Sequence, residues 1–169
     1  MNFLDLYRKY NQWHRNLPRE VGHIAVNHFL KSFDKEGLEG EPKWVQRKDG
    51  TSAGDRSTRR ALLVKSGALR RSIRIARLNS NSVSIGSDMI YAKIQNEGGT
   101  TNPTVTPKMR KHAWAMYKKT KNIFWKNLAT TKKTQLVVNI PARPFMKITF
   151  ALKQEIRQHI RQSLSQAFL

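Results

Sequence analysis

The chain has 169 residues, and its 32 lysines and arginines outnumber its 11 aspartates and glutamates, which gives a net charge of +21. It contains no cysteine, which excludes disulfides, thiolate metal sites and thiol nucleophiles and fits a reducing cytoplasm. Its N-terminus is too polar for a secretory signal and no apolar run is long enough to span a bilayer, so we expect no membrane association.

The positive charge is unevenly distributed. Residues 1–56 hold ten basic and eight acidic side chains, whereas residues 57–169 hold twenty-two basic side chains and only Asp88, Glu97 and Glu155 as acids. Such a surface attracts polyanions, which can be nucleic acid, an acidic protein face or a membrane. Charge alone does not choose among them.

The N-terminal region is predicted to be helical at about residues 3–33. A stripe of apolar residues at helical spacing begins at Phe3 and includes Leu6, Tyr7, Tyr10 and Trp13. Asn16-Leu17-Pro18 predicts a break, because Pro18 suits the first turn of a second helix. Residues 37–60 are rich in glycine, serine and charge and predict a long loop, in which Trp44-Val45 is an anchor packed on the domain.

The middle of the chain predicts a small sheet with an insertion. Strands at about 70–78 and 82–86 form a β-hairpin, and a third strand at about 135–140 is expected to join the same sheet. Between them, residues 100–133 form a basic insertion. Thr106-Pro107 predicts the start of a helix there, because threonine suits an N-cap and proline suits the position after it.

The C-terminal residues 144–168 predict a helix, because apolar side chains recur every four residues. The expected fold class is therefore α+β, with N-terminal helices, a small mostly antiparallel sheet, and a long C-terminal helix packed on the sheet. We expect residues 1–169 to form a single domain.

No arrangement of residues in the sequence indicates catalysis. The five histidines lack metal-ligand spacing, and no nucleotide-binding glycine loop or serine nucleophile motif is present. Asp49 and Asp55 are the closest approach to a carboxylate pair, in a loop that also carries arginine and lysine. We therefore expect no catalytic residue, no metal site and no cofactor, and a protein that is not an enzyme.

The basic insertion interleaves lysines with aromatic residues, which supports two interpretations. Basic and aromatic side chains together can bind single-stranded nucleic acid through phosphate contacts and stacking. Alternatively, the aromatics form a core and the lysines are the solvated side of two helices, which the helical spacing favours. The same lysines can also meet an acidic protein ring.

Four motifs occur in a particular order along the chain. They are the segment LLVKSGALRRSI at 62–73, VSIGS at 83–87, YAKIQNEG at 91–98 and IPARPFM at 140–146. In this order and at this spacing they resemble the phage virion morphogenesis family, the tail-completion and neck proteins of Mu-like and P2-like tailed phages. The resemblance covers about residues 17–160. The chain departs from it in the long stretch between Gly98 and Ile140, and in Gln95-Asn96, where relatives often carry His-Gln or a glutamate.

The resemblance implies a non-enzymatic assembly protein that acts in tail completion or head–tail joining. Its partners would be phage neck, tail or head proteins, and it would form a homo-oligomer or ring in the virion. It would be found in the bacterial host cytoplasm during assembly and then in the virion. The alternative is a basic nucleic-acid-binding protein, and a DNA contact is also compatible with the first reading.

The candidate interface lies in two places. Arg143 and Phe145 flank a proline-stiffened turn, and an aromatic anchor beside an arginine is typical of an interface hot spot. The alternative for Arg143 is that it caps local carbonyls or pairs with Glu97. The second place is the basic helix with Lys108, Lys111, Lys118 and Lys119. The residues expected to maintain the motifs structurally are Gly67, Leu69, Gly86, Tyr91, Gly98, Pro141 and Pro144.

Overall fold

A computed structural model describes residues 2–46 and 61–168 and confirms a mixed α+β fold. The described residues form two compact units. The helical unit comprises residues 2–44, 61–92 and 144–168, and the hairpin unit comprises residues 45–46 and 93–143. The part of the predicted loop from residue 47 to residue 60, with Asp49 and Asp55, lies outside the described residues.

Helix α1 (Phe3–Lys35) is continuous over 33 residues, so the predicted break at Pro18 is wrong. A proline inside a helix costs about 3 kcal/mol, because it removes one hydrogen bond and crowds the preceding turn. The apolar face stays in phase across Pro18, and Pro18 itself is buried, so packing offsets this cost. The helix ends where Glu36 adopts a left-handed conformation with φ 49° and Gly37 N–H donates to Ser32 O at 3.0 Å.

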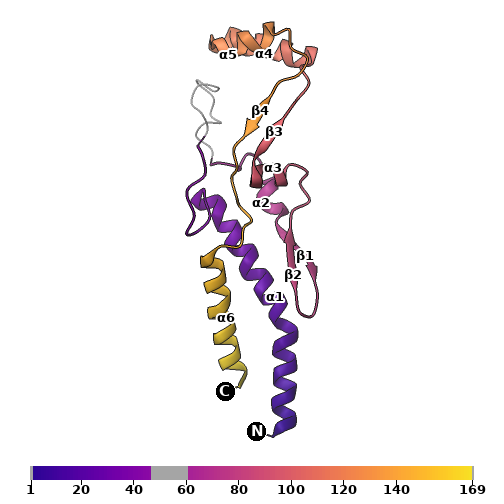
Figure 1. Ribbon diagram of the computed structural model, residues 1–169, viewed down its shortest axis with the longest axis vertical. Helices are drawn as coiled ribbons and strands as arrows, with labels where there is room; N and C mark the ends of the chain where they lie inside the picture. The colour runs from indigo at the N-terminus through magenta and orange to yellow at the C-terminus, as the bar shows by residue number, and fades with distance from the viewer. Residues whose placement is uncertain (1, 47–60, 169) are drawn as a thin grey trace. The chain divides into compact units, whose positions relative to one another are not determined.

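Helix α6 (Phe150–Phe168) runs antiparallel to α1 and packs against it, not on the sheet as predicted (Figure 1). Contacts between polar groups fix the register of the two helices. His28 Nδ1 lies 3.1 Å from Glu155 Oε2, and Trp13 Nε1 donates to Ser163 Oγ at 3.0 Å.

The start of α6 is set by Thr149, whose Oγ1 accepts from Leu152 N at 3.1 Å. The helix therefore begins after the proline-containing segment and not at residue 144.

Strands β1 (Arg74–Leu78) and β2 (Val83–Gly86) form the predicted antiparallel hairpin, with Ile75 opposite Ile85. The hairpin lies beside α1. Residues 70–72, predicted as strand, belong instead to the short helix α2 (Ala68–Ser72).

The core of the helical unit lies where α1, α2 and the segment before α6 meet. The ring of Phe33 packs against Trp44 at 5.7 Å and against Phe145 at 5.4 Å between ring centroids. Trp44 Nε1 donates to Pro144 O at 2.8 Å, so the predicted Trp44 anchor is buried and hydrogen-bonded, while its neighbour Val45 is exposed.

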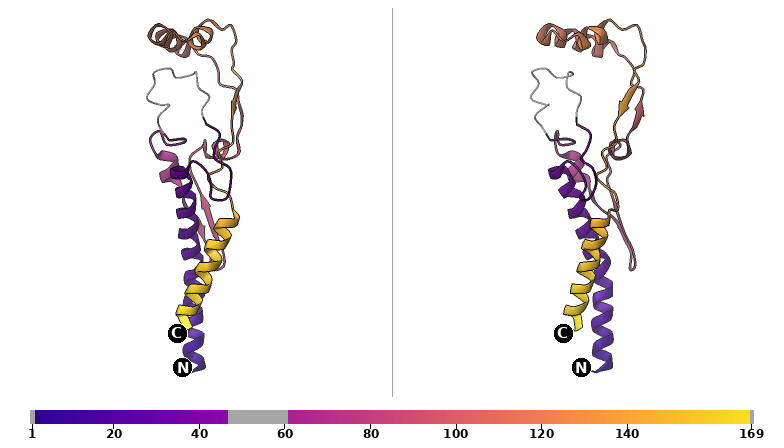
Figure 2. Two further views of the ribbon diagram at one scale, coloured as in Figure 1. Left: turned by 90° about the vertical axis from the view of Figure 1, so that its left-hand side faces the viewer. Right: turned by 60° about the vertical axis from the view of Figure 1, so that its left-hand side comes forward.

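The hairpin unit contains a second sheet, so the prediction that residues 135–140 join the first sheet is wrong. Helix α3 (Ala92–Glu97) leads into strand β3 (Gly99–Thr101), which pairs antiparallel with β4 (Val138–Ile140). The segment between these strands holds α4 (Pro107–Thr120) and α5 (Ile123–Thr130), as Figure 2 also shows.

Candidate functional site: the basic helical hairpin

Helices α4 and α5 form a helical hairpin in which each helix carries its own cap. Thr106 Oγ1 accepts from Met109 N at 3.2 Å, with Pro107 at the first helical position as predicted. Lys121 takes a left-handed conformation, and its N–H donates to Tyr117 O at 2.8 Å. Asn122 Oδ1 then accepts from Phe124 N at 2.9 Å to start α5. Local sequence therefore specifies both helices and the tight connection between them.

Strands and bridging hydrogen bonds join this hairpin to the rest of its unit. Beyond the β3–β4 pair, Val105 N donates to Thr134 O at 2.8 Å and Leu136 N donates to Pro103 O at 3.0 Å. The two connecting segments thus continue the antiparallel pairing up to the base of α4.

The contact between α4 and α5 is narrow. Ala113 and Ala129 are the buried residues of the two helices, and Trp125 packs against His112 at 5.9 Å and against Phe124 at 5.2 Å between ring centroids. Trp114, Ile123 and Phe124 nevertheless remain 41%, 61% and 44% exposed. The interpretation that the aromatic residues form a closed core therefore holds only in part.

Four lysines lie on the side of α4 that faces away from Ala113. At about 3.6 residues per turn, positions 108, 111, 118 and 119 project opposite position 113. Ala113 is fully buried and all four lysines are exposed. We call Lys108, Lys111, Lys118 and Lys119 the lysine row. It matches the predicted basic helix, whereas its role in binding stays a prediction.

The positive charges of the hairpin have no acidic partner among the residues that the structure describes. The segment 100–133 contains nine basic residues, and none of them takes part in any of the ion pairs found there. Arg110 makes a neutral contact, donating to Lys133 O at 3.3 Å. The hairpin is thus a concentrated cationic surface.

Arg143 donates hydrogen bonds to two main-chain carbonyl oxygens. Its Nε donates to Val45 O at 3.1 Å, and its backbone N–H donates to Gln95 O at 2.9 Å. The alternative role, capping a carbonyl, thus describes this side chain in the structure. An additional interface role stays a prediction.

Phe145 is fully buried in the helical unit, against Phe33. An interface anchor needs an accessible ring, so we correct its assignment from interface residue to core residue.

Gly67, Leu69 and Gly98 take positions that suit their residue types. Gly67 has φ 72° and precedes α2, and Leu69 is buried in the core. Gly98 has φ 75°, and a Cβ there would lie 2.7 Å from Ala142 N. Gly98 therefore allows the chain after α3 to pass close to the segment that follows β4. The other motif residues lie in β2, before α3 and around the turn that precedes α6: Gly86, Tyr91, Pro141 and Pro144.

A comparison with protein families matches residues 6–165 to the phage virion morphogenesis family. The chain belongs to this family. Comparisons with curated proteins and with solved structures found no match. The match starts and ends further out than the resemblance expected from the four motifs, so it includes most of α1 and of α6.

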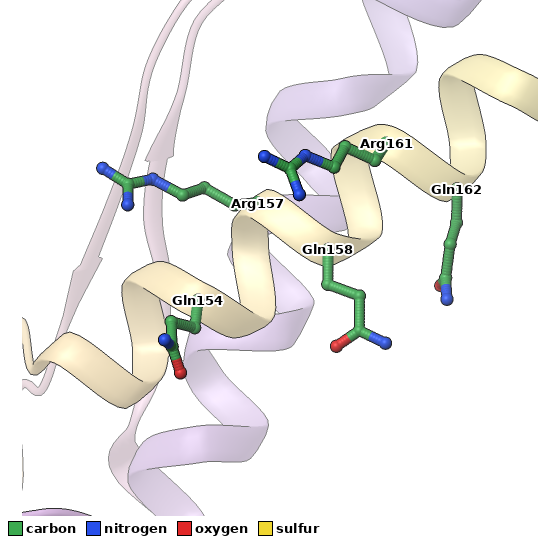
Figure 3. A pocket seen from close by; sticks show the side chains of 5 residues that line it. All are labelled: Gln154, Arg157, Gln158, Arg161 and Gln162. Atoms are coloured by element: carbon green, nitrogen blue, oxygen red, sulfur yellow. The ribbon is translucent and has the colours of Figure 1, made fainter.

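This family member has a polar outer face on α6. Figure 3 shows Arg157 and Arg161 on one side of the helix ribbon and three glutamines on the other. These residues line a shallow depression: Gln154, Arg157, Gln158, Arg161 and Gln162. Because all five come from a single helix, they cannot enclose a substrate, and no carboxylate or histidine lies among them.

Two histidines of the helical unit, His28 and His159, contact acidic residues within it. His28 is 4% exposed, with Nδ1 near Glu155 and Nε2 3.2 Å from Thr149 Oγ1, and His159 Nε2 lies 2.8 Å from Glu20 Oε2. Within residues 2–46 and 61–168, no group of three or more histidines and acids is placed to hold a metal ion. No helix in this described part is long and apolar enough to cross a membrane.

The N-terminal end of α1 exposes an apolar surface that sequence reasoning had not identified as accessible. Phe3, Leu6, Tyr7 and Tyr10 are 78%, 40%, 57% and 45% exposed. We call these four residues the N-terminal stripe. Figure 2 shows the start of α1 continuing past the end of α6, which explains why the stripe lacks a cover within the helical unit. The sequence showed the stripe by its spacing, but whether a second element covers it depends on where α6 ends.

Proposed function

We propose that this phage virion morphogenesis protein is a non-enzymatic structural part that acts in tail completion or head–tail joining. The observation that carries the proposal is the family match over residues 6–165. It binds neck, tail or head proteins, first in the bacterial host cytoplasm and then as part of the virion. Its single domain supplies binding surfaces and no catalytic centre.

The N-terminal stripe is the surface best suited to a protein contact. Exposed apolar residues that adjoin one another mark protein interaction sites more often than scattered ones do. Three of its four members are aromatic, the residue class enriched at the centre of interfaces. A virion part meets symmetric neighbours, so copies of the same chain in a ring are included among the proposed partners. Arg143 remains a candidate contact residue beside its capping role.

Complementation tests this proposal. A phage lacking the gene is supplied with the wild-type protein or with the Tyr7→Asp/Tyr10→Asp variant, which places two charges in the N-terminal stripe. Both tyrosines are exposed, so the variant is expected to keep its circular dichroism spectrum and melting temperature. We expect it to yield separate heads and tails by electron microscopy and few plaques.

The matched control is Arg8→Asp, which changes the net charge by the same amount from an exposed position outside the stripe. It is expected to complement like the wild type. Normal infectious particles with a folded Tyr7→Asp/Tyr10→Asp variant would remove the stripe from the proposal. Infectious particles without the gene would remove the assembly role itself.

A further inference from the structure

The lysine row is a strip of cations along one side of α4, in which consecutive Lys118 and Lys119 point about 100° apart. Its residues span positions 108 to 119 of a 14-residue helix, an axial length of about 16 Å at about 1.5 Å per residue. Between the two pairs of lysines, the same side of the helix carries only the small Ala115. B-form DNA carries one phosphate charge per about 1.7 Å of helix axis, so an array of this length can meet several phosphates at once.

The composition of the row argues against a protein partner. Lysine is depleted at the centre of protein–protein interfaces, where tryptophan, tyrosine and arginine supply most of the binding energy. The row consists of lysines, which donate hydrogen bonds but accept none, and Trp114 at its edge is the one such anchor residue beside it on α4. Phosphate backbones, by contrast, are bound by lysine without a shaped pocket and without sequence readout.

The row does not hold the helical hairpin together through ion pairs. Its lysines are exposed, and no acid among the described residues pairs with them. Lys108 and Lys111 are three positions apart, a spacing at which like charges destabilise a helix by about 0.2–0.5 kcal/mol. Lys118 and Lys119 lie in the last turn, where positive charge favours the helix, so helix stability accounts for two of the four lysines and an anionic ligand for all four.

The row has few aromatic residues beside it, which favours a duplex over a single strand. Trp114 is three residues from Lys111 and four from Lys118, so it flanks the row, and it packs edge-on against Tyr117 at 6.0 Å between ring centroids. Phe124 belongs to α5. Successive bases of a single strand stack on a series of aromatic platforms placed among the cations, whereas a single such ring, Trp114, flanks the row.

We propose that the lysine row binds the phosphate backbone of double-stranded DNA without reading its sequence. This adds a DNA contact to the proposed assembly function, and it locates that contact on the hairpin unit while the proposed protein contact lies on α1. The nucleic-acid-binding alternative from the sequence thereby becomes a second property of the same protein.

The test is the salt dependence of DNA binding by the full chain. A fluorescent 30-base-pair duplex of arbitrary sequence is titrated with protein at several potassium chloride concentrations, and binding is followed by anisotropy. Four phosphate contacts predict a slope of about −3.6 for log K against log salt, so affinity falls about 150-fold between 50 and 200 mM. Lys111→Gln/Lys118→Gln should halve this slope, to a loss of about 12-fold.

A second variant controls for net charge. Lys9→Gln/Lys153→Gln removes the same two charges from exposed positions of α1 and α6 and should leave the slope within about 0.5 of the wild type. If the two double variants reduce the salt-dependence slope equally, the overall charge and not the lysine row attracts DNA, and the proposal is overturned.

Two further results would also overturn it. A single strand of the same length that binds more tightly than the duplex, with binding abolished by Trp114→Ala, would assign the hairpin to stacking on bases. Head or tail subunits whose binding requires Lys111 and Lys118, with DNA binding unchanged in that variant, would assign the row to an acidic protein. Neither result bears on complementation through the N-terminal stripe, so the two proposals fail separately.

Discussion

Gly22 supports the contact between α1 and the β1–β2 hairpin, because a larger residue has no room there. A Cβ built at this position would lie 2.7 Å from Ile75 Cδ1 and 2.9 Å from Val83 Cγ2. In an exposed helix, replacing glycine by alanine stabilises by about 1 kcal/mol. Here the added methyl overlaps two side chains, and overpacking of this kind costs about 1–3 kcal/mol. Ile75 Cδ1 can rotate away, but Val83 is branched at Cβ and is held in one preferred rotamer.

We therefore expect Gly22→Ala to lower the free energy of unfolding by up to about 2 kcal/mol, which is the overpacking cost less the gain in helix propensity. For a chain of this size that corresponds to a fall in melting temperature of roughly 2–4 °C per kcal/mol. Urea unfolding followed by circular dichroism measures the change, and a constant m-value would show that only stability is affected.

Two further variants make the reasoning specific. Gly86→Ala is the matched control, because its Cβ would meet only Ala76 Cβ at an ordinary 3.4 Å, so no loss is expected. Val83→Ala removes the less movable of the two overlapping groups. In that background Gly22→Ala should cost at least about 0.5 kcal/mol less than in the wild type. If Gly22→Ala instead stabilises both the wild type and the Val83→Ala variant by the full gain in helix propensity, the β1–β2 hairpin does not lie on α1 at this point.

The other predictions concern residues from the family motifs. Phe145→Ala should lower the free energy of unfolding by about 3–5 kcal/mol in thermal or urea unfolding, because it empties a fully buried site. Arg143→Ala should lower the free energy of unfolding by only about 1 kcal/mol, because it removes the hydrogen bond to Val45 O. Equal losses of stability in the two variants would contradict the assignment of Phe145 to the core and of Arg143 to a carbonyl cap. Gly98→Ala should lower the free energy of unfolding by about 1–3 kcal/mol and speed amide exchange in β3 and β4. The reason is that φ at Gly98 is 75° and that the added Cβ would lie 2.7 Å from Ala142 N. Unchanged amide exchange would refute this close approach.

Features determined by neighbouring residues were predictable from the sequence. The Thr106-Pro107 start of α4 and the β1–β2 hairpin both follow from short-range chemistry, and the structure confirms them. The period-four apolar residues likewise predicted a C-terminal helix. Their period could not show what the helix packs against, because a helix and a sheet bury the same kind of stripe.

Features determined by distant partners were predicted wrongly or not at all. The pairing of β4 with Gly99–Thr101 joins segments about forty residues apart, and nothing in the alternation of a three-residue strand specifies its partner. Pro18 was interpreted from its local penalty, which tertiary packing offsets. In the candidate site, helical spacing predicted correctly that the lysines lie on the solvent side of α4. The burial of Phe145 could not be predicted in the same way, because an aromatic residue beside an arginine fits an interface and a core equally well.

The distribution of acidic residues explains why the uncompensated positive charge is concentrated on the helical hairpin formed by α4 and α5. In the described helical unit, Asp34, Glu39, Glu41, Asp88 and Glu155 all take part in ion pairs with lysines or arginines of the same unit, and Glu20 contacts His159. Exposed pairs of this kind contribute only about 0–1 kcal/mol each, so their larger effect is to neutralise the surface on which they lie. In the described hairpin unit, Glu97 is the only acid among eleven lysines and arginines. A polyanion therefore meets a partly compensated surface on the helical unit and an uncompensated one on α4. Neutralising Lys111 and Lys118 should for that reason reduce DNA affinity more than removing any two charges of the helical unit.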